Sequence, residues 1–330
     1  MAEFLTFDTD LTAVANAIRA KGGTSAQLIY PSGFVSAIQA IQTGITPKLV
    51  VTTTPGAAIT ATPAEGFKVV KGTAGADGMC TLELPKAGTW HVTAMANSVS
   101  NSQHIVIGTQ NMLLPLYHDT FANNTWEEII TVCRTGIAPD SWAVGDSKTM
   151  NIGGTAYQVD IIGKNHDEYA DGSGTAPLTF QLHDCYSEAK QMYSSNLSGL
   201  GWKNTDMRLT YLPAILALMP AEVQNGIHAV NKKTSEGGNS TTIETVSDTL
   251  FLLSEVEIFG TASASVAGEG SQYDYYKAGN PKIKKREGVD EFWWERSSAS
   301  GGMFCRVRAN GQAGASNASN SLGVSFAFCF

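Results

Sequence analysis

The chain has 330 residues, of which 16% are charged, and it carries a formal net charge of -8. This length accommodates two or three domains, and the scarcity of charge is typical of β-rich, loop-rich extracellular or virion proteins. The acidic balance excludes the basic surface that nucleic acids require, so we expect no nucleic-acid partner. The one basic run, Lys282 to Arg286, is interpreted as a solvated loop because no aromatic residues alternate with its charges.

The sequence predicts neither a signal peptide nor a membrane span. Its N-terminus lacks a basic region followed by an apolar one, and no later run approaches about 18 apolar residues. We therefore expect synthesis in the cytoplasm and no membrane insertion. The cysteines are odd in number and never form a C-x-x-C pair, so we expect no zinc site, no disulfide framework, and buried free thiols. They are Cys80, Cys133, Cys185, Cys305 and Cys329.

Residues 1–45 are expected to form a helical segment. Apolar residues recur at helical spacing from Leu11 to Ile18 and again from Phe34 to Ile41, with Asp10 and Ser32 as the expected N-caps. Each helix is too short to be stable alone in water, which predicts packing against another subunit or a larger assembly.

The segment D-L-T-A-V-A-N-A-I-R-A-K-G-G-T-S-A-Q-L-I-Y-P-S-G-F-V-S-A-I-Q-A-I resembles one that recurs in tail proteins of phages and prophages of Gram-positive bacteria. This resemblance implies attachment to other virion tail proteins and a homo-oligomer, with a trimer favoured. An oligomerising helical hairpin unrelated to virions is the alternative interpretation.

Residues 46–110 read as a small β-domain. Short alternating runs at 49–52, 68–70, 80–84, 90–94 and 104–107 are separated by turn signals such as Pro55-Gly56 and Asp77-Gly78. This pattern predicts a small β-sandwich of immunoglobulin-like or carboxypeptidase-regulatory type that acts as a spacer. Binding of carbohydrate by this domain is the weaker alternative.

Residues 111–330 are expected to form one α+β domain. Helices are predicted at 125–134, 187–197, 206–218 and 220–227, with strands at 155–162, 178–182 and 249–253. The multidomain chain is thus expected to be α+β overall.

Two polar clusters have the residue types of functional sites, but their spacing favours a structural interpretation. The acidic stretch 165–174 lacks the ligand spacing of a calcium-binding loop, since the third position from Asp167 is Tyr169. His183 and Cys185 are near neighbours, but a catalytic pair must converge in space, and no oxyanion element accompanies them. We therefore expect no metal, no cofactor and no catalytic residue.

A second resemblance covers about residues 140–330. It rests on N-H-D-E-Y-A-D-G-S-G, G-W-K-N-T-D-M-R, L-L-S-E-V-E-I-F-G, G-E-G-S-Q-Y-D-Y-Y and F-W-W-E-R-S, which are similar to uncharacterised C-terminal domains of gut-bacterial and phage proteins. Those domains are related to the C-type-lectin and formylglycine-generating-enzyme (sulfatase-modifying-factor) folds. Some are variable proteins of diversity-generating retroelements, so the resemblance implies a C-type-lectin-like domain with a variable face.

The C-terminal tail intersperses large anchors with small and polar residues. Trp293, Trp294, Phe304 and Phe326 are expected to form the scaffold, and no core requires the residues between them. The resemblance implies that these residues bind ligand and vary. They are Ser298, Ser300, Gly301, Gly302, Met303, Arg306, Arg308, Gln312, Gly314, Ala315, Ser316 and Leu322.

In the retroelement relatives, variable positions derive from Asn codons of a template whose adenines are randomised. The genetic code limits this assignment, because randomising the first two bases of an Asn codon can give Ser, Gly, Ala, Arg and Leu but neither Met nor Gln. Met303 and Gln312 therefore need a different template codon, or they do not vary. A flexible low-complexity end is the alternative for the tail, but linkers do not carry interposed Phe, Val and Trp.

Together these features predict a phage tail-tip receptor-binding protein that mediates host adhesion from the virion tail. Its partner is a host-surface receptor, either protein or glycan. A bacterial surface adhesin or a structural virion protein is the alternative. An enzyme of the sulfatase-modifying-factor type is disfavoured, because its candidate nucleophile, Cys305, has no neighbouring base in sequence.

Overall fold

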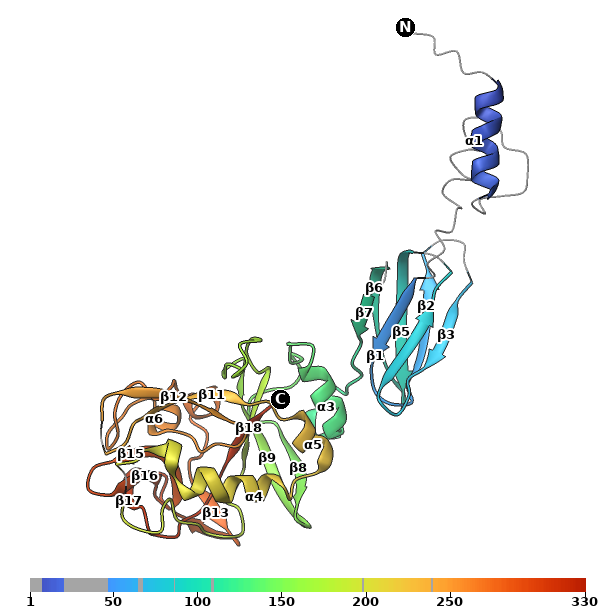
Figure 1. Ribbon diagram of the computed structural model, residues 1–330. Coiled ribbons are helices and arrows are strands. Elements are labelled where there is room, and N and C mark those ends of the chain that lie inside the picture. Colours follow the sequence, from blue (N-terminus) through green and yellow to red (C-terminus); the bar gives the residue numbers. More distant parts are fainter. Residues whose placement is uncertain are drawn as a thin grey trace. The chain divides into compact units, whose positions relative to one another are not determined.

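The computed structural model describes residues 8–20, 47–64, 68–85, 87–107, 110–197, 199–238 and 240–330. The chain divides into two compact units, Met1–Leu116 and Tyr117–Phe330 (Figure 1). Strands in several small, mostly antiparallel sheets dominate, accompanied by short helices, so the expected mixed α+β class is confirmed. Within the described ranges, no helix is long and apolar enough to cross a membrane.

The first unit begins with α1, Asp8–Ala20. Ala15 and Ile18 of the predicted apolar stripe are buried, whereas Val14 is 45% exposed. The prediction of Asp10 as N-cap is wrong, because the helix already begins at Asp8. Acidic residues are favoured throughout the first turn of a helix, so the sequence Asp-Thr-Asp does not determine at which aspartate the helix begins. The second expected helix and Ser32 lie outside the described residues.

Two sheets make up the rest of the first unit, in the strand orders β4-β1-β7 and β3-β2-β5-β6. Their inward side chains, including Leu49, Ile59 and Trp90, form one shared core. The strands are β1 Lys48–Thr52, β2 Ala58–Pro63, β3 Val70–Thr73, β4 Met79–Glu83, β5 Gly88–Ala96, β6 Val99–Ile107 and β7 Gln110–Leu113.

Four expected runs of the β-domain overlap strands over most of their length, whereas the run at 68–70 overlaps β3 only at Val70. The strands β2 and β7 were not expected, and β2 lies between two expected runs. The β2 sequence, A-I-T-A-T-P, mixes strand-forming Ile and Thr with Ala and Pro, which are depleted in strands, and it pairs with both β3 and β5. β7 pairs parallel to β1, which carries the first unit beyond residue 110.

The second unit contains the remaining elements. Its helices are η1 Phe121–Asn123, α3 Trp126–Cys133, η2 Trp202–Asn204, the π-helix η3 Met207–Tyr211, α4 Leu212–Leu216, α5 Ala221–Gly226, α6 Glu255–Phe259 and α7 Asp274–Lys277. Its strands are β8 Ser147–Ile152, β9 Thr155–Lys164, β10 Leu178–Leu182, β11 Val230–Ser235, β12 Ile243–Asp248, β13 Lys284–Arg286, β14 Val289–Glu291, β15 Trp293–Ala299, β16 Met303–Val307, β17 Ala313–Asn317 and β18 Ala327–Cys329.

The C-terminal strand β18 lies at the centre of the second unit's core. It pairs antiparallel with β10, and Ala327 also bridges to Phe251. Residues 323–330 are all buried. The expected final strand at 324–328, with alternate residues buried, is therefore corrected to Ala327–Cys329 with both faces covered.

The predicted helix at 187–197 is wrong. The backbone there runs beside the C-terminal tail instead: the amide of Lys190 donates to the carbonyl of Leu322, and that of Met192 donates to Ala318. These long-range hydrogen bonds replace the helical ones, so tertiary pairing overrides a local helical pattern.

Two further predictions need correction. Residues 249–253 contain only an isolated bridge at Phe251, and the strand lies earlier, in the β11–β12 hairpin. The basic run is not a solvated loop, because its residues 284–286 form β13 and Lys284 is 4% exposed. The Lys284 ammonium donates to the carbonyls of Leu182 and His183, and burial lowers its pKa to about 8.

Candidate functional site

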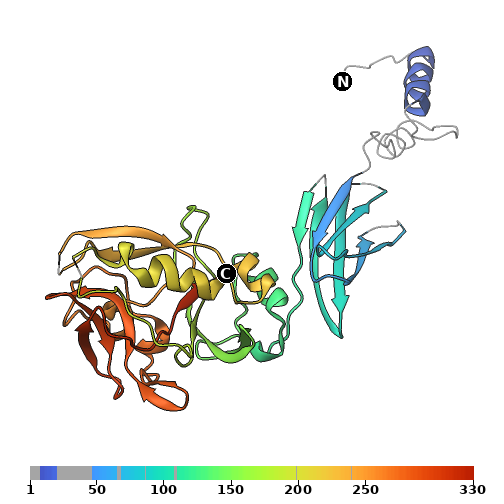
Figure 2. The same ribbon diagram turned by 60° about the horizontal axis from the view of Figure 1, so that its bottom comes forward.

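Strands β15, β16 and β17 form a three-stranded antiparallel sheet that carries half of the expected ligand-binding residues. Figure 2 shows these C-terminal strands, coloured red, gathered in one part of the second unit. Arg306 lies opposite Trp294 and Gly314, and Phe304 lies opposite Ser316. Directly opposed residues share a face, so these five residues lie on one face of the sheet.

The other face carries Met303, Cys305 and Ala315. The expected single face is thus divided between the two sides of the sheet, because neighbouring residues along a strand point in opposite directions. Trp294 and Phe304 lie beside Arg306 and not behind it.

The exposure of the expected site residues varies. Ser300, Gly301, Arg308 and Gln312 are exposed, whereas Gly302, Met303, Arg306, Gly314, Ala315, Ser316 and Leu322 are partly exposed. Leu322 lies outside the sheet, where it bridges to Lys190. The four scaffold residues Trp293, Trp294, Phe304 and Phe326 are fully buried.

Ser298 is a correction, because it is only 1% exposed. It belongs to β15, whose seven residues are all buried. This strand contacts β11 and α6, and the amide of Arg296 donates to the carbonyl of Leu253, so the rest of the unit covers it. Ser298 therefore cannot contact an external ligand in this conformation.

Gly301 and Gly302 form the turn between β15 and β16, with φ angles of 68° and 76°. A Cβ atom on Gly302 would lie 2.5 Å from the carbonyl oxygen of Asn196, whereas one on Gly301 would approach only the Met303 methyl, at 3.8 Å. Gly302 is consequently required by the fold and cannot vary freely.

Arg306 is held in place from two sides. Its guanidinium lies 4.3 Å from the centre of the Phe292 ring, and its Nε donates to the hydroxyl of Ser316. Phe292, which is 37% exposed, was not predicted as a site residue. In the sequence, Phe292 is one of three consecutive aromatic residues, F-W-W, and the sequence alone does not show which of the three faces outward.

Arg308 follows the end of β16 and lies close to Arg306. Its Nε is 2.8 Å from the position that a Cβ on Gly314 would take, so the absence of a side chain there makes room for it. Burial, and then the charge of Arg308, lower the pKa of Arg306, while Glu295 acts in the opposite direction. Among the described residues, ion pairs involve Arg208, Arg286 and Arg296 but neither Arg306 nor Arg308.

A buried ionic network lies next to this sheet. Both guanidinium ends of Arg296 donate to the carboxylate of Glu257, at 2.5 and 2.8 Å. Lys232 lies 2.8 Å from Glu257 and 2.6 Å from Asp167, and Asp167 also accepts from Tyr273. All five side chains are buried, so directional contacts join β11, α6, β15 and Tyr273, the N-cap of α7.

Asp167 ties the acidic stretch 165–174 to β11 through its ion pair with Lys232. Burial alone would raise its pKa, but the charge and hydrogen bond of Lys232 lower it to about 2. Among the residues whose structure is described, no three His, Cys, Asp or Glu side chains are placed to hold a metal ion.

Three buried carboxyl groups surround Cys305. Neither oxygen of Glu295 has a hydrogen-bond partner among the described residues. Burial, and then the charges of Glu255 and Glu269, raise the pKa of Glu295 well above its ordinary value. Burial, followed by the same three carboxyl groups, also raises the pKa of the Cys305 thiol, so the thiolate needed of a nucleophile is strongly disfavoured.

The His183–Cys185 pair does not converge on a reaction centre. His183 Nδ1 lies 2.7 Å from the carboxylate of Asp160, and burial raises the pKa of Cys185 to about 12.

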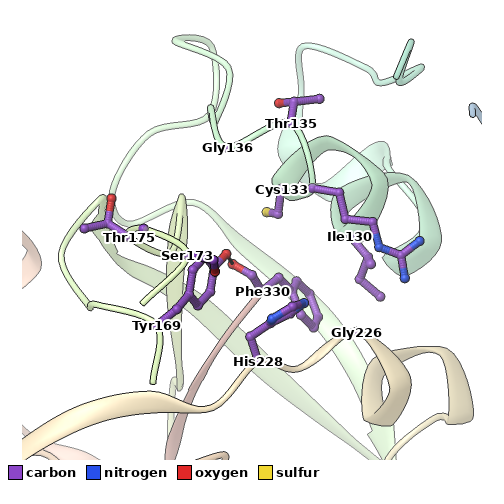
Figure 3. Close-up of a pocket in the computed structure, with 12 residues that line it drawn as sticks. Ile130, Cys133, Thr135, Gly136, Tyr169, Ser173, Thr175, Gly226, His228 and Phe330 are labelled. Carbon is purple, nitrogen blue, oxygen red and sulfur yellow. Dashed lines mark hydrogen bonds between the residues drawn. The ribbon is translucent and has the colours of Figure 1, made fainter. Parts of the chain in front are cut away.

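A cavity of about 450 Å³ lies elsewhere in the same unit (Figure 3). It is lined by Ile130, Cys133, Arg134, Thr135, Gly136, Tyr169, Ser173, Gly174, Thr175, Gly226, His228 and Phe330. The sequence did not predict it, because its residues come from four distant segments. In the sequence, the signal for this cavity is limited to Tyr169 and His228, which place ring side chains in otherwise polar loops.

Comparison with protein families gives one match: residues 179–330 fit the model described as "Domain of unknown function (DUF6273)". The matched segment runs from β10 to the C-terminal strand and includes the whole β15–β17 sheet. Searches among curated proteins and among solved structures gave no match.

Proposed function

We propose that this chain is a receptor-binding protein of a phage or prophage tail, and that the β15–β17 sheet contacts the host receptor. In this proposal the helical N-terminal segment attaches to the virion and assembles the oligomer. The immunoglobulin-like first unit is a spacer, and the second unit is a C-type-lectin-like domain whose ligand-facing residues vary.

One observation carries the proposal: Arg306 and Arg308 lie side by side without a carboxylate partner among the described residues, although neighbouring cations are paired. Arg306 is already fixed by Phe292 and Ser316, so little side-chain entropy would be lost on binding. Two adjacent guanidinium groups repel each other, and hydrogen-bond acceptors on a receptor would relieve that repulsion.

The buried network supports the same conclusion. Arg296, Glu257 and Lys232 hold the strand that precedes the Gly301–Gly302 turn, so substitutions at exposed positions beyond the turn leave the scaffold intact. A surface with small side chains on a fixed framework suits weak single contacts that several copies on one virion strengthen by avidity.

The test is host-cell adsorption by the full-length double variant Arg306→Gln/Arg308→Gln. Interface arginines can each contribute about 2 kcal/mol, which corresponds to roughly thirtyfold weaker binding. The double variant Lys233→Gln/Lys277→Gln is the matched control, because it removes the same charge from two exposed lysines outside the sheet. Adsorption that falls only in the arginine variant, with both melting temperatures unchanged, supports the proposal. Equal adsorption of both variants would place the binding surface elsewhere.

A further inference from the structure

The cavity of Figure 3 has an apolar floor. Ile130 and Cys133 of α3 and the ring of Phe330 are almost fully buried beneath it. The hydroxyl of Tyr169 donates to the Phe330 carbonyl over 2.8 Å, which fixes the tyrosine ring at the wall. The His228 ring lies 5.1 Å from the Tyr169 ring at a tilt of 49°. Two ring surfaces and an apolar floor therefore meet in one space.

The rim of the cavity is polar. Thr135, Ser173 and Thr175 are exposed there and carry hydroxyl groups, and the exposed Arg134 adds a guanidinium. A volume of about 450 Å³ lies within the range typical of small-ligand sites. A sugar ring presents an apolar C–H face and a fringe of hydroxyl groups, and this combination matches an aromatic wall under a hydroxyl-bearing rim.

Charge at the rim favours an acidic ligand. Among the described residues, Arg134 takes part in no ion pair, unlike Arg208, Arg286 and Arg296. Asp171 lies near His228, and the pKa of Asp171 is lowered first by its hydrogen bonds with Ser173 and, to a smaller extent, by His228. The rim therefore holds one carboxylate near the His228 ring, and the guanidinium of Arg134 has no ion-pair partner among the described residues.

Gly226 is essential to the shape of the cavity. A Cβ atom at this position would lie 2.5 Å from Cδ1 of Ile130, so α5 can approach α3 only where the side chain is absent. The close contact of these two helices forms one wall of the cavity.

We infer that this cavity is a binding site for a single acidic sugar unit, with its ring on Tyr169 and its anionic group at Arg134. The site shares no residue with the β15–β17 surface, so it can be tested independently of the proposed receptor contact.

The test is calorimetric titration of the full-length chain with methyl glucuronide, glucose 6-phosphate and methyl glucoside. The first two ligands distinguish a carboxylate from a phosphate as the recognised anion, and the third lacks a charge. We expect an acidic sugar to bind with a Kd on the order of 1 mM and more tightly than the neutral one. Arg134→Gln should weaken acidic-sugar binding at least about tenfold, since it removes a charge-assisted hydrogen bond to the anionic group. Thr175→Trp should obstruct the cavity for all three ligands.

Arg308→Gln is the matched control, because it removes the same guanidinium from the other surface. Unchanged binding in this control, together with loss in Arg134→Gln, supports the inference whatever the outcome of host adsorption. The inference is overturned if no acidic sugar binds the parent chain, if the neutral sugar binds equally well, or if Arg134→Gln and Thr175→Trp both bind like the parent.

Discussion

Glu257 is the residue on which the buried network depends. It contacts Arg296 and Lys232, and it also accepts from the amide of Ser254 to complete the cap of α6. Burial would raise its pKa, but the charges of Arg296 and then Lys232 lower it, so the carboxylate stays ionised. Without that charge, the buried cations Arg296 and Lys232 lose the carboxylate that they share.

We therefore expect Glu257→Gln to lower the free energy of unfolding by about 3–5 kcal/mol, the typical cost of breaking a buried ion pair. Urea denaturation measures it. Glu244→Gln, which breaks the more exposed Lys203–Glu244 pair, is the control and should cost less than about 1 kcal/mol. Similar losses in both variants would show that the buried network does not hold the unit together.

Glu295 differs from Glu257 in that burial raises its pKa well above the ordinary value. Its raised pKa means that the folded chain retains a proton that the unfolded chain loses above about pH 4.3. The folded state then binds more protons than the unfolded state, so this group lowers stability as pH rises. Groups with lowered pKa values, such as Asp167 and Glu257, act in the other direction and lose their contribution as pH falls.

Glu295→Gln should thus become progressively more stable than the parent chain as pH increases from about 5 to 8. Melting temperatures of the two chains across that range provide the test, and their difference cancels the other titrating groups. A difference that stays constant, or that grows toward low pH, would mean that Glu295 is ionised in the folded state.

At the scale of elements, the turn between β15 and β16 limits which expected positions can vary. Gly301 and Gly302 both have positive φ, so an alanine at either position is strained, but only Gly302 also faces a backbone oxygen. Gly302→Ala should be the more destabilising change by at least about 1 kcal/mol. Equal unfolding midpoints for Gly301→Ala and Gly302→Ala would contradict this packing.

Local patterns predicted elements that have strong caps or a continuous run of strand-forming residues. Helix α3, with its Thr125–Glu128 capping box, and strands β9 and β10 agree with the sequence-based prediction. The segment at 187–197 and the strand β2 do not, because partners far along the chain determine their backbone.

The same limit applies to the site. Alternation of anchors with small residues located the β15–β17 region, but it could not show that β15 is covered on both faces or that Phe292 supports Arg306. Ser298 was misplaced for that reason. The cavity beside Tyr169 could not be predicted at all, since it exists only after four segments meet.

At the scale of the whole molecule, the two units have separate cores. Removal of residues 1–44 should therefore leave the second unit folded while lowering the oligomer number, because short amphipathic helices require partners. Sedimentation velocity of the full-length and truncated chains checks this expectation. An unchanged oligomer number after truncation would remove the assembly role proposed for this segment.

The central claim is that the exposed part of the β15–β17 sheet selects the host. Its most direct test exchanges Ser300, Met303, Arg308, Gln312 and Ser316 together, leaves every buried residue and Gly302 in place, and measures adsorption to a panel of host strains beside the melting temperature. Surface substitutions usually change stability by no more than about 0.5 kcal/mol each, so the fold should survive. The account predicts adsorption to a different subset of strains at a nearly unchanged melting temperature. An unchanged set of strains bound by a folded variant would contradict it.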